Sequence, residues 1–517
     1  MDGRPAVKGK APTARIQSAD ALRAALQAQP CQIDVLTCAC WFKAMQRSEW
    51  PTPDDLELLA EQLPKLVRNS PRYILNEKTY TQWSSLFLKV GNAPHGNQQL
   101  DPLLRDMADW LNDLPEGLGP QSVGTLLYNL QAMPSTPGTE AVLQAMARHI
   151  SKTPSLSAQA IGNALYGLQN MPSTDGTEAV LQAMARHISK TPSLSAQAIG
   201  NALYGLQNMP STDGAEAVLK AMAGHISETP LSAQAIGNAL YGLQNMPSTD
   251  GTEAVLRVIA PRISEASPLS GQEIGNALYG LQNMSSTDGT EAVLLAIAEH
   301  IFPEFSLSAQ QIGNALSGLQ NMSPTAGTHA VLDALVVHAA RISANDVTQS
   351  DIPPATYLAE CIFSVRNHLT DPSTKSLITQ ISRSLNLPLR PHDLTPATYS
   401  RTLWRLLNPR HIYNDPQHGH LREVDLHHLS HKLGRAFCTM ALHRLLPACD
   451  TLRVVYGSSR HLAANKGKMR ESAELALSQF KGEGYTITYA FQKNRPSVQV
   501  TKTAESAHHT LSPSHSM

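Results

Sequence analysis

The stretch I-G-N-A-L-Y-G-L-Q-N-M returns several times along this chain without change. Its unchanged copies begin at Ile161, Ile199, Ile236 and Ile274. A fifth copy has Ser317 in the tyrosine position, and a looser copy begins at Val123. The spacing of about 38 residues is typical of stacked helical arrays, in which each unit contacts only its neighbours. We therefore expect a mostly α-helical protein whose main part is an α-solenoid of helix-turn-helix repeats.

One repeat, residues 157–192, contains two helical patterns. The first places apolar side chains on one stripe, namely Ile161, Ala164, Leu165, Leu168 and Met171. Pro172 ends this pattern, and a short polar turn follows. The second stripe comprises Val180, Leu181, Met184, Ala185 and Ile188. Neither helix can bury its stripe alone, so neighbouring repeats must stack.

Capping residues mark the expected helix starts. Ser157 can cap the first helix, and Glu273 and Gln311 stand in the capping-box position of later copies. For the second helix, we predict that Asp175 and Glu178 form the capping box.

Weaker copies of the pattern extend the array on both sides. Trp41 and Phe87 occupy the tyrosine position before it, and Phe363 and Trp404 occupy that position after it. Terminal repeats are expected to be atypical because their outer faces meet water. The predicted organisation is a disordered basic N-terminus (1–18), degenerate repeats (19–120), near-identical repeats (121–345), degenerate C-terminal repeats (346–410), a small α/β domain (411–503) and a disordered tail (504–517).

Composition narrows the class of protein. The 517 residues are 42% hydrophobic, enough for a continuous core, and no apolar run is long enough for a membrane span. Six cysteines in so long a chain do not indicate a disulfide framework. Cys31, Cys38 and Cys40 cluster without a second ligand pair, so we expect packing residues rather than a zinc site. We expect a cytoplasmic or otherwise intracellular, reducing location, with secretion into a host cell or organelle targeting left open by the basic N-terminus.

A polar stripe recurs along the first helices. At about 100° per residue, Gln159, Tyr166 and Asn170 lie within about 60° of Asn163. We predict that two positions of this stripe contact nucleic acid, one base per repeat. These residues are Asn163, Asn201, Asn238, Asn276 and Asn314, with Tyr166, Tyr204, Tyr241 and Tyr279. The alternative is that each asparagine bonds the backbone of the neighbouring repeat and holds the stack together.

The repeats resemble octotricopeptide-type repeats, whose first helix carries a similar small-Asn-x-Leu-aromatic-x-Leu pattern. They also resemble the long tandem helical repeats of plant-pathogen type III effectors. The first resemblance implies RNA binding with one base per repeat. Two features oppose it. Residues 137–345 carry a net charge of about −7, which repels phosphates, and near-identical repeats would all recognise the same base.

The last hundred or so residues differ in pattern and in charge. From residue 390 to residue 502 the net charge is about +9. The expected elements follow the order β-α-β-α-β-β, at residues 424–427, 432–446, 452–457, 468–480, 485–491 and 497–502. This order predicts an α/β sandwich of about 80 residues.

Residues suited to phosphodiester chemistry stand at two turns of this domain. Asp425 and His427 alternate along a strand, so both side chains leave one face, and the aspartate can prepare the histidine for general acid–base work. The predicted catalytic residues are Asp425, His427, Gly457 and His461. The residues predicted to bind nucleic acid are Arg453, Arg460, Lys466, Lys468 and Arg470. A binding module without cleavage is the alternative, and His427, His428 and His431 lack a clear fourth ligand for a metal.

The same segment, residues 421–502, resembles an Smr domain, the small MutS-related nuclease module. Val424-Asp425-Leu426-His427 matches its Leu-Asp-x-His motif with valine for leucine, and the second motif matches at residues 456–461, followed by Arg470. The resemblance implies endonuclease activity. Ser459 stands where the family has its second glycine; its backbone amide remains, but the glycine's conformational freedom does not.

Together these patterns favour a helical array that selects RNA and a basic domain that binds or cuts it. The resemblance implies a plan similar to plant organelle proteins that join helical RNA-binding repeats to an Smr domain. The rival class is a non-enzymatic scaffold whose acidic array holds another protein, such as a secreted effector in a host cell. RNA or DNA, the target sequence, and any cofactor or metal stay open.

Overall fold

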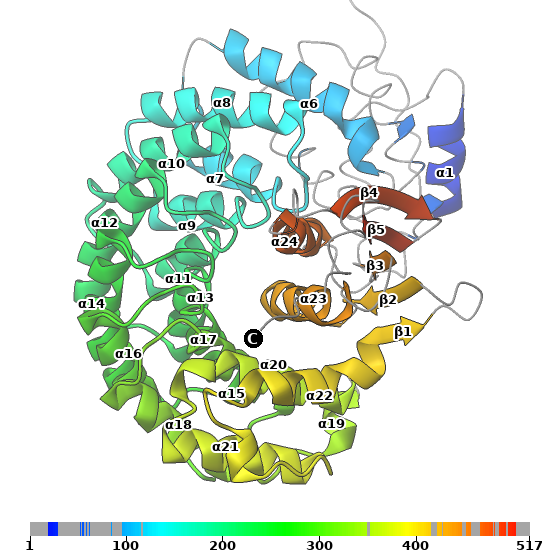
Figure 1. Cartoon of the computed structure of the whole chain (residues 1–517). Coiled ribbons are helices and arrows are strands. Elements are labelled where there is room, and N and C mark those ends of the chain that lie inside the picture. The colour runs from blue at the N-terminus through cyan, green and yellow to red at the C-terminus, as the bar shows by residue number, and fades with distance from the viewer. Residues whose placement is uncertain are drawn as a thin grey trace, which may run out of the picture. The chain divides into compact units, whose positions relative to one another are not determined.

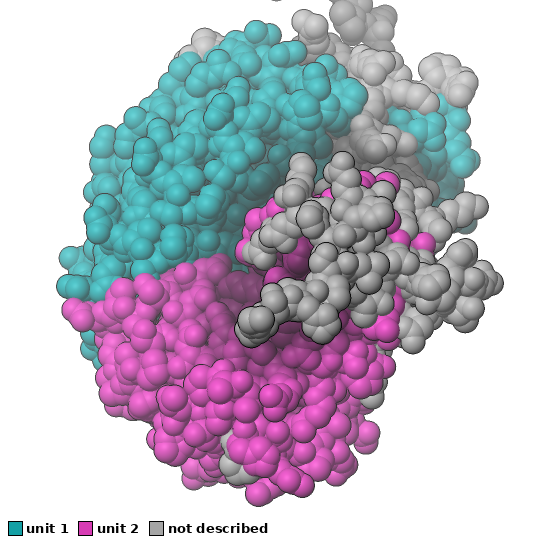
Figure 2. Space-filling model, in the orientation of Figure 1, with its two compact units in different colours: residues 1–267 teal, residues 268–517 magenta. Residues whose placement is uncertain are grey.

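The computed structural model describes residues 19–28, 96–114, 117–304, 306–348, 352–414, 421–426, 428–446, 451–455, 466–478, 480, 485–492 and 495–502, with isolated positions between 52 and 84. This described part is mostly helical, and its strands lie toward the C-terminal end (Figure 1). The chain forms two compact units, residues 1–267 and residues 268–517 (Figure 2). The predicted disordered ends, the three clustered cysteines, Trp41 and Phe87 lie outside the described residues.

Unit 1 consists of helices in two layers, a first-helix layer and a second-helix layer. Among the described residues, the helices before the near-identical repeats are α1 (Ala19–Gln27) and α6 (Gly96–Asp113). The first helices are α7 (Pro120–Tyr128), α9 (Ala158–Tyr166), α11 (Ala196–Tyr204) and α13 (Ala233–Tyr241). The second helices are α8 (Pro137–Lys152), α10 (Asp175–Ile188), α12 (Asp213–Glu228) and α14 (Asp250–Glu265). Each helix packs mainly against its equivalents in adjacent repeats, and α6 packs on α8 (Figure 1). The expected stacking of consecutive helix pairs is confirmed.

Unit 2 has the same plan before the strands begin. Its first helices are α15 (Gly271–Tyr279), α17 (Ala309–Gly318), α20 (Pro354–Ser364) and α22 (Tyr399–His411), which pack in succession. Its second helices are α16 (Asp288–Ala298), α18 (Ala326–Ala339) and α21 (Pro372–Ser384). Short connecting elements are α19 (Ala344–Thr348), η2 (Arg366–His368) and η3 (Pro391–Asp393). The degenerate repeats expected around Phe363 and Trp404 are therefore helical.

The apolar stripes form the core of the stack. Both stripes predicted in residues 157–192 are buried, with Ile161 and Ile188 fully inaccessible. Each such side chain contributes about 1.5–3 kcal/mol when it leaves water. Close approach of adjacent repeats also requires a glycine. A Cβ placed on Gly205 would lie 2.0 Å from the Leu165 carbonyl oxygen of the preceding repeat.

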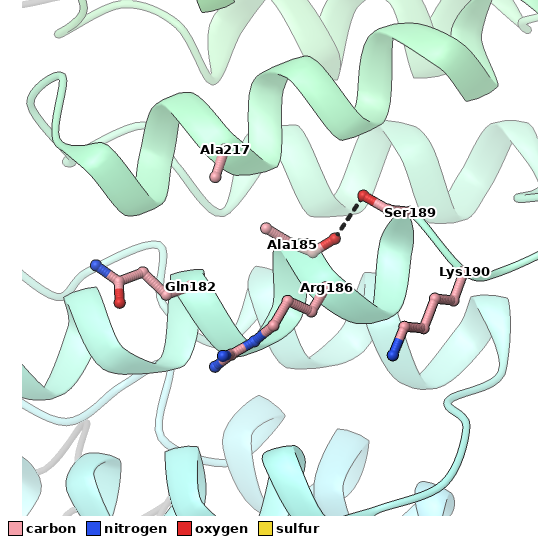
Figure 3. A pocket seen from close by; sticks show the side chains of 6 residues that line it. All are labelled: Gln182, Ala185, Arg186, Ser189, Lys190 and Ala217. Atoms are coloured by element: carbon pink, nitrogen blue, oxygen red, sulfur yellow. Dashed lines mark hydrogen bonds between the residues drawn. The ribbon is translucent and has the colours of Figure 1, made fainter.

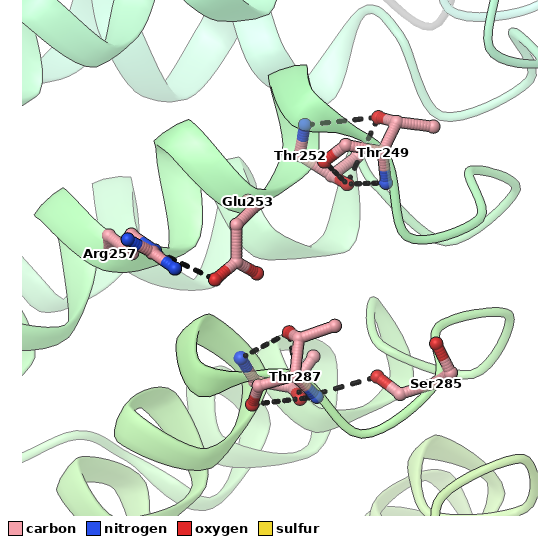
Figure 4. Close-up of polar contacts among 7 residues, drawn as sticks. Thr249, Thr252, Glu253, Arg257, Ser285 and Thr287 are labelled. Atoms are coloured by element: carbon pink, nitrogen blue, oxygen red, sulfur yellow. Dashed lines mark hydrogen bonds and ion pairs between the residues drawn. The ribbon is translucent and has the colours of Figure 1, made fainter.

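The second helices begin differently from the prediction. Thr174 is the N-cap of α10, and it exchanges hydrogen bonds with Thr177 in a reciprocal capping box. The predicted Asp175–Glu178 box is wrong, because the threonine hydroxyls close the box by themselves. The same arrangement starts α14, where Thr249 pairs with Thr252 (Figure 4).

Glu178 instead bonds the next repeat. Its Oε1 accepts a hydrogen bond of 2.6 Å from the Gly214 N–H at the start of α12. Negative charge at a helix N-terminus is favourable because the first amides are unpaired and the helix dipole is positive there. The equivalent pairs are Glu140–Gly176, Glu216–Gly251 and Glu291–Gly327.

Histidines tie the other end of the second helices. In α10, His187 Nε2 lies 2.8 Å from the Ile150 carbonyl oxygen at the end of α8. The equivalent pairs are His149–Leu111 and His225–Ile188. A second helix such as α10 is thus bonded near both ends to its neighbours, and most of these polar residues serve the stack.

The C-terminal part of unit 2 is a five-stranded sheet among the described residues, with strand order β1-β2-β3-β5-β4. The strands are β1 (Ile412–Asn414), β2 (Leu421–Asp425), β3 (Thr451–Val455), β4 (Tyr485–Gln492) and β5 (Arg495–Lys502). Only the β2–β3 pair is parallel. The helices α23 (His431–Leu445) and α24 (Lys466–Ser478) pack together on one face of the sheet (Figure 1). The predicted β-α-β-α-β-β order is confirmed, and β1 was not predicted.

Candidate nucleic-acid interface

The tyrosines of the first helices stack on one another. The ring centroids of Tyr128 and Tyr166 are 5.7 Å apart, and those of Tyr166–Tyr204 and Tyr204–Tyr241 are 5.5 Å apart. The rings are nearly parallel, at 17° to 19°. Bases stack at about 3.4 Å, so a base between two rings would need about 7 Å. The tyrosines therefore leave no gap for an intercalated base, and a ligand meets only their outer edges.

Burial and the neighbouring rings raise the pKa of Tyr204 above its usual value. The causes, in order, are burial and the proximity of Tyr241 and Tyr166. Its hydroxyl thus stays protonated and remains a hydrogen-bond donor at neutral pH. Tyr279 in unit 2 occupies the equivalent, partly exposed position of α15.

The asparagines preceding the tyrosines form an amide row that makes no side-chain hydrogen bond within the described part of the chain. The amide row of unit 1 comprises Asn163, Asn201 and Asn238, and the equivalent residues of unit 2 are Asn276 and Asn314. All five are partly exposed. Their helices carry almost no charge; α9, α11 and α13 share the sequence AQAIGNALY. The amide row is a neutral face with unused donors and acceptors.

A second row of asparagines donates hydrogen bonds to the preceding repeat. Asn170 Nδ2 donates to the Gln131 carbonyl oxygen of the preceding repeat at 2.6 Å. The same bond recurs at Asn208, Asn245 and Asn321. Beside it, glutamine side chains bond each other across repeats, as in Gln169 Nε2 to Gln131 Oε1 at 2.8 Å. The structure therefore divides the predicted polar stripe, and Asn170 follows the alternative in which amides hold the stack.

In the C-terminal domain, Asp425 ends β2 and is partly exposed. Beyond the end of β2, His428 adopts a left-handed backbone with φ 64°. Such a conformation is uncommon outside glycine, and strained residues often stand at functional turns. His427, Gly457, Arg460 and His461 lie outside the described residues, so the predicted catalytic group is represented only by Asp425.

The predicted cations of the domain differ in their surroundings. Arg453 pairs across the sheet with Glu423 at 3.5 Å, and its side chain is only 23% exposed. Arg470 lies on α24, with its Nε 2.8 Å from Glu474 Oε1 and half of its side chain exposed. Lys466 and Lys468 fall in the first turn of α24. Of the two arginines, Arg470 therefore has the more exposed side chain.

The domain is anchored on the repeats of unit 2 by residues that the sequence did not indicate. Both oxygens of Glu360 on α20 bond Ser430, the N-cap of α23, at 2.5 Å to its N–H and 2.9 Å to its hydroxyl. Lys432 Nζ lies 2.9 Å from Asn283 Oδ1, in the turn after α15. Burial raises the pKa of Glu360 to about 7, although the bonds from Ser430 lower it. A lone acid within the apolar run of α20 was the available signal.

Aromatic packing completes this anchor. The Trp404 ring of α22 lies 5.8 Å from the Phe437 ring of α23, and the Arg444 guanidinium lies 4.7 Å above the Trp404 ring. Trp404 stands in the tyrosine position of its degenerate repeat. The last repeat therefore uses this position to hold the α/β domain.

No group of three potential metal ligands gathers among the described residues, and no helix among them is both long and apolar enough to cross a membrane. Cys361 and Cys438 are free and buried. No protein-family model and no curated protein sequence matches this chain.

Proposed function

We propose that the first-helix layer binds single-stranded nucleic acid, RNA above all, through the amide row. The observation that carries this proposal is the contrast between the bonded and unbonded asparagines of one repeat. An amide offers both donors and an acceptor, which suits the Watson–Crick edge of an unpaired base. The stacked tyrosines form a continuous edge beside the amides, with hydroxyl groups that donate hydrogen bonds.

The negative charge of the array is a weaker objection than its total suggests. Four glutamates each accept a hydrogen bond from a backbone N–H at the start of a second helix in the next repeat. They are Glu140, Glu178, Glu216 and Glu291. The first helices that carry the amide row are nearly uncharged. Positive charge for the phosphates would come from the C-terminal domain, which is basic overall and is bonded to the repeats through Lys432.

Because the repeats are near-identical, the amide row should bind an RNA segment in which one base is repeated. The test is fluorescence anisotropy of the full chain with labelled rA, rC, rG and rU oligomers longer than about 16 nucleotides. We expect one homopolymer to bind best and duplex RNA to bind least. Equal or absent binding of all four would contradict base recognition by the repeats.

We further propose that the C-terminal domain acts on the bound strand as an Smr-like nuclease through Asp425 and His427. The strained turn at His428, directly after these residues, supports a functional site there. Asp425 would orient and charge the imidazole, which moves the proton. Asp425→Asn in the full chain should abolish cleavage and leave RNA affinity within a few-fold, while Asp175→Asn, at the exposed start of α10, should change neither. A wild-type chain that binds RNA but never cleaves it leaves a binding module.

A further inference from the structure

The second-helix layer of unit 1 carries a cluster of cations that lies apart from the amide row, and of these cations only Arg148 bonds a neighbouring helix of the described chain. We name it the basic groove, formed by Arg148 and Lys152 on α8, by Arg186 on α10 and by Lys190 in the turn after α10. All four residues are exposed. Arg148 and Lys152 are four positions apart on α8, so they share one helix face about 5–6 Å apart.

The groove consists of two neighbouring depressions between helices. One lies between α8 and α10, encloses about 630 Å³, and has both arginines and Lys152 in its walls. The other lies between α10 and α12, encloses about 430 Å³, and is lined by Arg186 and Lys190 (Figure 3). Alanines form the floor, among them Ala185 and Ala217, which leave the space between the helices open (Figure 3).

The cations are available to a ligand. Arg148 bonds the side-chain oxygen of Asn112, whereas Arg186, Lys152 and Lys190 make no side-chain hydrogen bond or ion pair with described residues. The serine hydroxyls beside them are already bonded within their own helices; Ser189 Oγ donates to the Ala185 carbonyl oxygen at 3.0 Å (Figure 3). The free polar groups of the walls are therefore mainly positive.

The basic groove is confined to two repeats. On α6, Asp109 and Asp113 are exposed near the end of the helix that packs on α8. On α12, the positions equivalent to Arg186 and Lys190 are Gly224 and Glu228. The positive surface is thus bounded by acidic residues on both sides, on helices that are three spacings of about 8–10 Å apart.

We propose that the basic groove binds a short acidic segment of a partner protein. Carboxylates of such a segment would pair with the two arginines and two lysines, and its small apolar side chains would cover the alanine floor. A polynucleotide fits less well, because its charge continues in both directions and would meet the flanking acids. This surface belongs to the second-helix layer and is independent of the amide row.

The test uses the full chain and a fluorescein-labelled peptide of Asp, Glu, Ala and Leu. The control is an uncharged peptide in which Asn replaces each Asp and Gln replaces each Glu. We expect anisotropy to show binding of the acidic peptide alone, weakening as salt rises. Arg186→Gln with Lys190→Gln should weaken binding about tenfold. Both changes are on exposed positions, and an unchanged circular dichroism spectrum confirms that the fold is kept.

The third repeat offers a gain-of-function control. Gly224→Arg with Glu228→Lys would extend the basic groove by one repeat, and a Cβ on Gly224 meets nothing within 4 Å. We expect this variant to bind the acidic peptide several-fold more tightly than wild type.

Three outcomes would overturn the proposal. They are failure of the acidic peptide to bind, equal binding by the Gln variant, and displacement of the peptide by single-stranded RNA in a manner that needs Arg186 and Lys190. The last would assign the groove to phosphates. RNA that binds without disturbing the peptide supports two separate surfaces.

Discussion

Asn170 and Asn163 belong to the same repeat, yet the two side chains differ in their hydrogen bonding. Asn170 donates a short bond to the backbone of the preceding repeat, whereas Asn163 makes no side-chain bond within the described chain. Both recur in every near-identical copy. Recurrence of a polar residue therefore does not distinguish a structural role from a binding role; its hydrogen-bond partner does. The same test separates the bonded Glu178 from the unbonded Arg186 in α10.

The greatest loss of stability is expected where the backbones of adjacent repeats come closest. Gly205→Ala would force a Cβ to within 2.0 Å of the Leu165 carbonyl oxygen, so it should cost roughly 3 kcal/mol or more of stability. Gly224→Ala is the matched control; its Cβ is in open space, and the better helix propensity should stabilise by up to ~1 kcal/mol. Urea unfolding followed by circular dichroism measures both, and equal midpoints for the two variants would contradict the packing described here.

A smaller loss of stability should distinguish an acid that bonds the next repeat from an exposed acid. Glu178→Ala leaves the Gly214 N–H at the start of α12 without its acceptor, so we expect a loss of about 1–2 kcal/mol. Glu228→Ala removes an exposed acid at the end of α12 and should change stability by less than about 0.5 kcal/mol. Hydrogen exchange of the first turn of α12 should rise in the first variant only. A rise in both, or in neither, would remove the role given to Glu178.

A smaller effect is expected from pH at the anchor of the C-terminal domain. The folded-state pKa of Glu360 is raised to about 7 from 4.5, so its contribution is fully present below about pH 4.5 and is lost as pH rises through about 7. Protease cleavage between the repeats and α23 should therefore increase from pH 5.5 to pH 8.

Glu360→Gln is the control for this pH effect. The amide oxygen can still accept from the Ser430 N–H, and nothing at this position titrates, so the variant should stay anchored across the range. His428 and His431 stand close to Ser430 in the sequence, and imidazole is the side chain that ordinarily changes charge near neutral pH. If the Gln variant keeps the full pH dependence, these histidines and not Glu360 are responsible.

The sequence predicted the architecture because repetition and apolar spacing are local signals. The buried stripes, the serine caps and the β-α-β-α-β-β order all came from such patterns. What it missed depends on partners one repeat away or further. Glu178 lies three residues after a plausible cap, and only stacking shows that it reaches Gly214. Glu360 meets Ser430 across 70 positions, a contact that no local pattern contains.

The candidate site was predicted in part for the same reason. Helical geometry placed Asn163, Tyr166 and Asn170 on one stripe. It could not show which of the two amides forms a hydrogen bond with the preceding repeat. It also could not foresee that the tyrosine rings stack on each other at 5.5 Å. Arg453 was expected to face nucleic acid from its charge alone, whereas strand pairing sets it opposite Glu423.

The role of the amide row in RNA binding is tested by two triple variants, Asn163, Asn201 and Asn238 to alanine, and Asn170, Asn208 and Asn245 to alanine. For each, homopolymer RNA affinity and the urea midpoint are measured on the full chain. The first set should lose at least about tenfold in affinity with an unchanged midpoint, since each lost bond to a base contributes ~0.5–1.5 kcal/mol. The second set should lower the midpoint. Undiminished RNA binding by the first variant would contradict base recognition by the amide row.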